Sequence, residues 1–215
     1  NWDALTNDSK YSGTKTNTLI VTETAGDYEY QLRARNNGCE WKSSASVFLT
    51  VLAEPEFSNY PGDATVCGNV AKTFNITVTN ATEYQWYVKN GTNWDALTND
   101  SKYSGTKTNT LIVTETAGDY EYQLRARNNG CEWQISESIK LKVIADPEFS
   151  TYPNNATVCL NTAQQFSITA INTTEYQWYV KNGTNWDALT NDSKYSGTKT
   201  NTLIVTETAG DYEYQ

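Results

Sequence analysis

The residues best able to do chemistry in this sequence are its cysteines and its carboxylates. Four cysteines stand at positions 39, 67, 131 and 159, so two equal short intervals flank a longer one. The sequence contains no histidine, the residue that most often serves as general base and metal ligand. Cysteines without a Cys-x-x-Cys pair or a histidine do not predict a metal site. We therefore expect no catalytic residues, no metal and no cofactor.

The carboxylates outnumber the basic side chains. Twenty-five Asp and Glu against 16 Lys and Arg give a formal net charge of −9. A carboxylate pair could serve glycosidase chemistry, but we assign these groups, Glu115 included, to a solvated surface. The segment Thr98–Lys102 lacks the Asp-x-Asp-x-Asp-Gly order of a calcium loop. The excess of acidic residues argues against a nucleic-acid partner. No apolar run reaches the roughly 20 residues of a membrane span. We therefore predict no nucleic-acid partner, no membrane insertion and no enzymatic activity.

The aromatic residues divide into two predicted groups. Thirteen per cent of the residues are aromatic, too many for a disordered chain. Trp86, Tyr120 and Tyr122 are predicted to mark the core. The residues that could contact a ligand, for example a sugar ring, lie near strand ends or on an outward face: Trp94, Trp133 and Tyr87. Packing at the edge of the sandwich and solvation are the simpler interpretations of these residues.

An internal repeat defines the elements that position these residues. Asn1–Trp41 recurs unchanged at Asn93–Trp133, and its first part, Asn1–Gln31, recurs again at Asn185–Gln215, so the period is 92 residues. That length fits a small autonomous domain and exceeds a solenoid unit. Apolar strand ends followed by proline mark the boundaries. We predict the end of one repeat at 1–53, a complete repeat at 54–145 and the beginning of the next at 146–215.

Alternating apolar and polar residues predict strands throughout the complete repeat. Phe74 and Ile76 share one face of such a strand, and turn pairs such as Asn90-Gly91 separate the strands. On the last strand, Val47, Leu49 and Val51 of one copy become Ile139, Leu141 and Val143 of the next, whereas the intervening Phe48 and Thr50 become lysines. Apolar residues are thus kept only on one face, as a packed interior requires. The fold class is predicted to be all-β, an antiparallel sandwich.

Several of these residues resemble an immunoglobulin-like domain. Trp86 stands where the buried strand-C tryptophan belongs, and Tyr120 stands at the tyrosine-corner position. Three segments resemble motifs of the tandem Ig-like domains in Bacteroidota surface adhesins: Val66-Cys67-Gly68-Asn69, Asn129-Gly130-Cys131 and Tyr103–Leu111. The resemblance implies an extracellular, cell-surface location, type IX secretion and a link to gliding or adhesion. The usual inter-sheet disulfide is absent, because Tyr122 occupies one of its positions.

Each complete repeat contains one Val-Cys and one Gly-Cys cysteine. The simplest pairing joins Cys67 to Cys131 as a structural disulfide within the repeat. In Ig topology, however, these positions lie toward opposite ends, and a disulfide needs Cα atoms within about 7 Å. A bridge from the Val-Cys cysteine of one repeat to the Gly-Cys cysteine of the next, or free thiols, are the alternatives. Either bridge implies an oxidising compartment.

We expect the chain to be a structural segment of a long extracellular fibre or adhesin stalk. Its partners would be neighbouring repeats of the same chain, with surface glycans or proteins bound through other parts of the parent protein. One alternative is a multivalent glycan- or protein-binding module. Another is a spacer array in a secreted polysaccharide-degrading enzyme.

Overall fold

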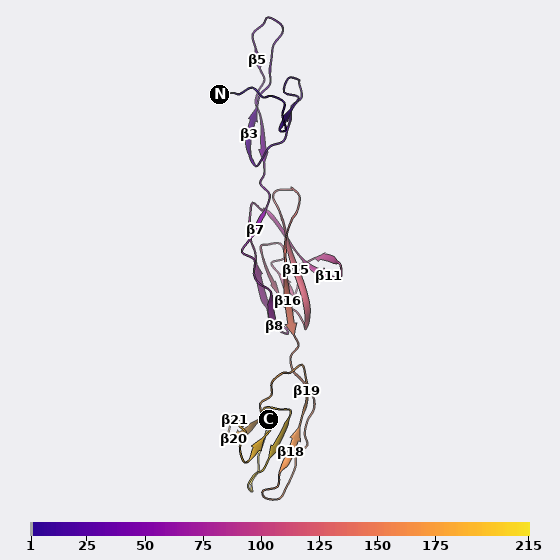
Figure 1. Ribbon diagram of the computed structural model, residues 1–215, viewed down its shortest axis with the longest axis vertical. Helices are drawn as coiled ribbons and strands as arrows, with labels where there is room; N and C mark the ends of the chain where they lie inside the picture. The colour runs from indigo at the N-terminus through magenta and orange to yellow at the C-terminus, as the bar shows by residue number, and fades with distance from the viewer. Residues whose placement is uncertain (1) are drawn as a thin grey trace. The chain divides into compact units, whose positions relative to one another are not determined.

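The chain is an all-β protein in a computed structural model that describes residues 2–215. Asn1, the first residue of the predicted 1–53 fragment, lies outside this range. No described residue is helical, so none forms a helix able to cross a membrane. Backbone contacts group the chain into two compact units: residues up to Ala64 with Ala71–Thr114 and Asp119–Leu141, and Thr65–Val70 with Glu115–Gly118 and Lys142–Gln215. The strands that form the sheets of each repeat are shown in Figure 1.

The complete repeat forms the most extensive sheet. Its order is β12 (Asn93–Ala96), β11 (Glu83–Asn90), β15 (Gly118–Arg127), β16 (Gln134–Ile144) and β8 (Ala64–Cys67). A second sheet has the order β13 (Tyr103–Ser104), β14 (Thr110–Val113) and β9 (Lys72–Asn75). A smaller pair joins β10 (Thr77–Thr79) to β7 (Glu56–Ser58).

The flanking copies repeat part of this pattern in shorter sheets. In the first copy the pairs are β1 (Tyr11–Ser12) with β2 (Ile20–Val21), β3 (Gly26–Tyr30) with β6 (Val47–Val51), and β4 (Arg33–Ala34) with β5 (Lys42–Ser43). In the last copy they are β17 (Glu148–Thr151) with β19 (Thr169–Ile171), β20 (Tyr179–Asn182) with β21 (Asn185–Ala188), and β18 (Gln164–Ser167) with β23 (Thr202–Val205) and β22 (Tyr195–Ser196).

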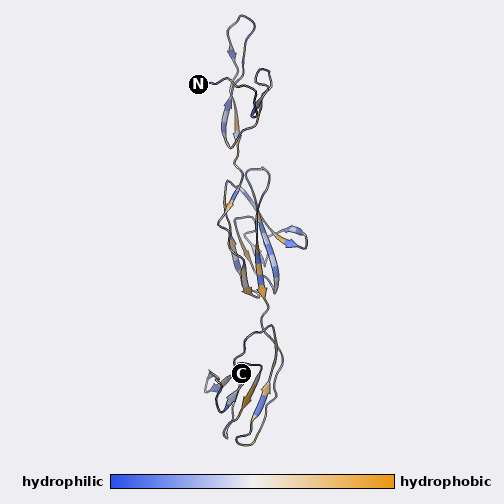
Figure 2. Cartoon of the chain, viewed as in Figure 1, coloured by the Kyte–Doolittle hydropathy of each residue, from blue (hydrophilic) through white to orange (hydrophobic). Residues whose placement is uncertain are grey.

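The core of the complete repeat consists of side chains from both larger sheets. Hydrophobic and hydrophilic residues alternate along the same strands (Figure 2), because successive side chains of a strand point to opposite faces. Leu111 on β14 pairs with Phe74 on β9, and both are fully buried, whereas Ile112 between Leu111 and Val113 is 41% exposed. The remaining buried apolar residues include Ile76, Trp86, Tyr122, Leu124, Ala126, Ile139, Leu141 and Val143. The all-β sandwich prediction is therefore confirmed.

Candidate binding face

The outward face of the five-stranded sheet carries the residues that could meet a ligand. Strands β11 and β15 pair so that Tyr87 lies opposite Gln123 and Glu83 lies opposite Arg127. On the same side, Trp94 of β12 lies opposite Lys89 of β11. This set of side chains will be called the cation–aromatic face, defined as Tyr87, Lys89, Trp94, Arg125, Arg127 and Trp133.

Each aromatic ring of this face lies beside a cation. The Arg125 guanidinium is 4.0 Å from the centroid of the Tyr87 ring. The Arg127 guanidinium is 4.6 Å from the centroid of the Trp133 ring. These contacts leave Tyr87 and Trp133 half-buried. A cation–π contact at such a site contributes about 0.5–1 kcal/mol, so the face is stabilised by its own side chains.

The third pair is looser and recurs in the last copy. Lys89 Nζ is 5.8 Å from the Trp94 ring centroid, the same distance as between Lys181 and Trp186 in the last copy. Trp94 is half-buried. The tryptophans predicted as ligand-facing are thus neither part of the core nor freely exposed, and in each of these pairs a cation lies over the ring.

Two ion pairs neutralise most of the charge on this face. Arg127 Nη2 is 2.6 Å from a carboxylate oxygen of Glu83, and this hydrogen bond lowers the pKa of Glu83. Lys89 Nζ is 2.6 Å from Glu121, which also accepts a hydrogen bond from the Ser138 hydroxyl at 2.6 Å. These two donors lower the pKa of Glu121. Both carboxylates are therefore committed to their own sheet.

Arg125 is the exception on this face. Among residues 2–215, no carboxylate lies within ion-pair distance of its guanidinium. Its buried Nε also has no hydrogen-bond partner there. The face therefore has one uncompensated positive charge, placed against Tyr87. The spacing of Arg125 and Arg127, two residues apart on an alternating strand, is the sequence signal for a shared cationic face.

Trp86 and Tyr122 lie in the interior of the repeat. Both are fully buried, and the Trp86 indole Nε1 donates a hydrogen bond to the Thr108 carbonyl at 2.9 Å. Tyr120 is half-buried, and its ring stacks on that of Tyr122 with centroids 6.5 Å apart. In the first copy, the counterpart of Tyr120 is Tyr28, whose hydroxyl donates to the Thr24 carbonyl at 2.9 Å. That bond is the defining contact of a tyrosine corner.

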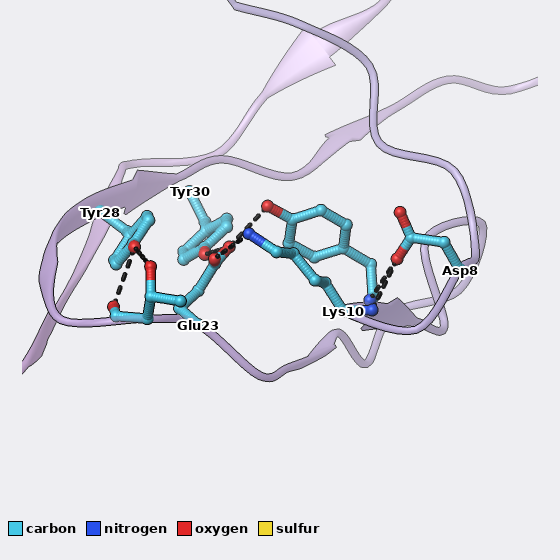
Figure 3. A network of polar contacts seen from close by, with 7 residues as sticks. Asp8, Lys10, Glu23, Tyr28 and Tyr30 are labelled. Atoms are coloured by element: carbon cyan, nitrogen blue, oxygen red, sulfur yellow. Dashed lines mark hydrogen bonds and ion pairs between the residues drawn. The ribbon is translucent and has the colours of Figure 1, made fainter.

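A buried carboxylate network replaces the surface position expected for Glu115. Glu115 is only 2% exposed, so its assignment to the solvated surface is wrong. Its counterpart Glu23 accepts hydrogen bonds from the hydroxyls of Tyr11, at 2.5 Å, and Tyr30, at 2.9 Å. Lys10 Nζ lies 3.3 Å from the same carboxylate (Figure 3). These hydrogen bonds, the one from Tyr11 foremost, lower the pKa of Glu23.

The last copy builds the same network around Glu207. Burial opposes ionisation of Glu207, but hydrogen bonds from Tyr195, Lys194 and Tyr214 outweigh it and hold its pKa below the usual value. Burial and the neighbouring carboxylate raise the pKa of Tyr214. The tyrosines therefore remain protonated donors and the glutamate remains an anion. The ionised glutamate and its donors are thus a structural hydrogen-bond network within the fold. The sequence signal for this network is a glutamate seven residues before its second tyrosine.

The segment considered for calcium is a hydrogen-bonded turn. Asp100 Oδ1 accepts the backbone N–H groups of Lys102 and Tyr103, each at 2.8 Å. Asn99 Oδ1 accepts from the backbone and the hydroxyl of Thr106. These oxygens are already used, and within residues 2–215 no three Cys, Asp or Glu side chains cluster as metal ligands would.

The structure contains the four cysteines as free, exposed thiols and places Cys67 and Cys131 far apart. Cys67 ends β8, and the next residue, Gly68, bonds through its N–H to the carbonyl of Ile144 at the end of β16. Cys131 lies three residues before β16 begins. An eleven-residue strand therefore separates the two thiols, or roughly 35 Å at the strand rise per residue. A disulfide tolerates about 7 Å between Cα atoms.

A hollow of about 820 Å³ lies in the last copy. Its lining includes Phe166, Ile168, Trp178 and Tyr214, and the counterparts of these residues in the complete repeat are Phe74, Ile76, Trp86 and Tyr122, all fully buried. The complete repeat also contributes buried residues from β16, whose counterpart is not among the 215 residues. The hollow is thus interior surface of the sandwich.

Comparison with known proteins establishes the fold. The sequence matches no protein-family model and no curated protein. An I-band fragment of titin has a TM-score of 0.53 and 17% identity, covering 91% of this chain and 71% of the fragment. A three-Ig structure of a mutated titin variant has a TM-score of 0.53, 18% identity and the same coverage. Drosophila OTK extracellular domains 3–5 reach a TM-score of 0.46 at 15% identity, covering 97% of this chain and 76% of theirs. The fold is that of tandem Ig-like sandwiches.

Proposed function

We propose that this chain is a structural segment of a long extracellular fibre or adhesin stalk, built from tandem Ig-like repeats. The observation that carries the proposal is that the complete repeat buries its core within its own 92 residues, with both larger sheets supplied by one copy. A unit that folds by itself can be added to an array without altering its neighbours. Length then grows with the number of copies.

The linker before the complete repeat supports a spacer role because it is hydrogen-bonded to that repeat. The Asn128 side chain donates to the Ala53 carbonyl at 3.0 Å, and the Asn80 side chain donates to the Glu54 carbonyl at 3.4 Å. Pro55 is buried and has its own backbone φ fixed by its ring. A linker held in this way restricts bending far more than a Gly/Ser linker does.

The assignment of this stalk to a bacterial cell surface rests on the sequence resemblance. The Val-Cys-Gly-Asn and Asn-Gly-Cys elements support a surface protein of a Bacteroidota species, exported by type IX secretion and used in adhesion or gliding. Neighbouring repeats would be the immediate partners, and surface glycans or proteins would bind elsewhere on the parent protein. Labelling of intact producing cells with an antibody to the repeat tests this location, and labelling only after lysis would contradict it.

Small-angle scattering of chains with two, four and six repeats tests the spacer role. The eleven residues of β16 span about 36 Å, and the linker brings one repeat to about 40 Å. We expect the maximum dimension to rise by about that amount per repeat. Asn128→Ala in every copy, which frees the linker carbonyl, should make the array more compact, whereas Asn90→Ala, which removes a hairpin contact to Asp95, should not. Growth with the square root of repeat number in the unaltered chain would contradict the proposal.

The uncompensated charge on the cation–aromatic face favours a second function, the recognition of acidic groups. Arg125 beside Tyr87 offers a guanidinium for a carboxylate and an aromatic edge for a sugar or peptide. Repetition of weak sites would raise the overall affinity. An array of acidic and neutral glycans tests this, with Arg125→Ala as the disabling variant and the exposed Lys107→Ala as the charge-matched control. Binding that both variants lose equally would be non-specific charge attraction.

A further inference from the structure

Each cysteine-bearing loop of the complete repeat is fastened to a linker. At one end, the N–H of Gly68, next to Cys67, donates to the Ile144 carbonyl at 2.9 Å. Gly68 also faces the Asp146 carboxylate, since a Cβ placed on it would lie 3.7 Å from Asp146 Oδ2. Cys67 is therefore held at the linker that leads to the following copy.

The Asn-Gly-Cys loop is fastened to the other linker. Asn128 donates through its side chain to the Ala53 carbonyl at 3.0 Å. Its own carbonyl accepts the N–H of Cys131 at 3.0 Å. Cys131 is therefore held at the linker that comes from the preceding copy. Backbone contacts agree, because they group Cys131 with the residues up to Ala64 and Cys67 with Lys142–Gln215.

The 92-residue period brings these two attachments together. One period after Ala53 stands Ala145, so the Asn-Gly-Cys loop of the following copy would bond to the Ala145 carbonyl. Gly68 bonds to the carbonyl of Ile144, the residue directly before it. Cα atoms of adjacent residues are about 3.8 Å apart. The Val-Cys cysteine of one repeat and the Asn-Gly-Cys cysteine of the next are thus anchored at neighbouring peptide units of one linker.

We propose that a disulfide joins these two cysteines at every junction between successive repeats. In this numbering, Cys67 pairs with the cysteine one period beyond Cys131, at position 223. The four cysteines of the chain then have their partners in other copies, and all four are free and exposed here. Two thiols lose two electrons and two protons to a small external disulfide, which leaves as two thiols while the S–S bond forms.

The turn that presents the Val-Cys cysteine is the same in two copies. Asn69 has a φ of 58° and its N–H donates to the Glu115 carbonyl at 3.0 Å. Asn161 likewise has a φ of 58° and donates to the Glu207 carbonyl at 3.3 Å. Glu207 belongs to the tyrosine network of its copy, and Glu115 is its buried counterpart. The cysteine loop is therefore fastened to a constrained residue of its repeat.

The cross-links would limit how far the array can be stretched. The segments Cys39–Cys67 and Cys131–Cys159 are equal in length, and each runs from one copy into the next. With every junction bridged, one such segment runs from a disulfide at one junction to a disulfide two junctions further on. Fully stretched, such a segment reaches about 100 Å, whereas two folded repeats already span about 80 Å by the strand rise. This mechanical value rests on the proposed stalk function, but the disulfide itself does not.

Thiol counting tests the cross-link. The 215-residue chain, refolded with oxidised and reduced glutathione and alkylated, should show four free thiols by intact mass. A chain extended beyond Gln215 by a copy of Leu124–Ala145 gains the cysteine at position 223 and should show three free thiols and one disulfide. Pairing within repeats would instead leave two free thiols in the 215-residue chain and one in the extended chain. Five free thiols in the extended chain would also overturn the proposal.

Two matched variants of the extended chain identify the partner. Cys67→Ser should abolish the disulfide, whereas Cys131→Ser should leave it intact, since both side chains are exposed and neither supports the core. Loss of a disulfide in both variants would restore the pairing within one repeat. If the disulfide is found but scattering shows a flexible array, the cross-link stands and the stalk function fails.

Discussion

Replacing Leu111 by alanine tests the sandwich register directly. Leu111 is fully buried opposite Phe74, whereas its neighbour Ile112 is 41% exposed on the other face of the same strand. Removing a buried leucine side chain costs about 3 kcal/mol through lost transfer energy and the cavity left behind. The Ile112→Ala control should cost no more than about 0.5 kcal/mol. A repeat of 92 residues has a total stability of about 5–14 kcal/mol, so both variants should remain folded.

Hydrogen exchange of the amides of strand β16 measures the difference in stability between the two variants within the complete repeat. The sequence Gln134–Ile144 occurs once in the chain, unlike the strands shared between copies. It also belongs to the other sheet, so its slowest amides report the stability of the whole sandwich. Leu111→Ala should accelerate their exchange by roughly 150-fold, at about 1.4 kcal/mol per factor of ten, and Ile112→Ala by about twofold. Equal acceleration in both variants would refute the assignment of the inward face.

Three further outcomes follow from the geometry. Gly105 and Gly91 both have a positive φ, but a Cβ on Gly105 would lie 2.1 Å from the Thr110 carbonyl oxygen, whereas one on Gly91 would meet nothing within 4 Å. Gly91→Ala should lower the free energy of unfolding by about 1 kcal/mol, and Gly105→Ala should lower it clearly more. Thermal melts of the two variants measure this difference. The lowered pKa of Glu207 means that its ionised form stabilises the fold above about pH 4.5 and that this contribution disappears as the pH falls further. Glu207→Gln should therefore flatten the loss of urea resistance between pH 5 and 3, and an unchanged pH profile would contradict the network. Trp86→Phe removes the donor to the Thr108 carbonyl and should lower the free energy of unfolding by about 1–3 kcal/mol, so an unchanged denaturation midpoint would argue against that bond.

Alternation and repetition made the sandwich and its interior predictable. Trp86, Leu111 and Ile139 all occupy inward positions of alternating strands, and all are buried. The reason is that side-chain direction along a strand has a period of two, which the order of residues states directly. Contacts between distant segments have no such periodic signal. The pairing of Arg127 with Glu83, 44 residues away, depends on β11 and β15 lying side by side.

The buried glutamates show where sequence reasoning fails. Residue type alone places Glu115 in solvent, because a carboxylate is rarely buried without partners. Its counterpart Glu23 is held by two tyrosine hydroxyls and a lysine, which come from positions 7 to 13 residues away. Those donors offset the cost of removing the charge from water. Only the folded chain shows that they converge.

Residue order alone establishes the 92-residue period, the strand faces and the presence of two cysteines in each complete repeat, because identity, alternation and composition can all be read along the chain. Where those cysteines lie is a property of the folded chain. Strand β16 separates Cys67 from Cys131 and places each beside a different linker. Spacing along the chain carries no information about which end of a sandwich a loop reaches, since that depends on the direction of every strand between the two positions. The same cysteines therefore change from partners within a repeat to proposed links between repeats.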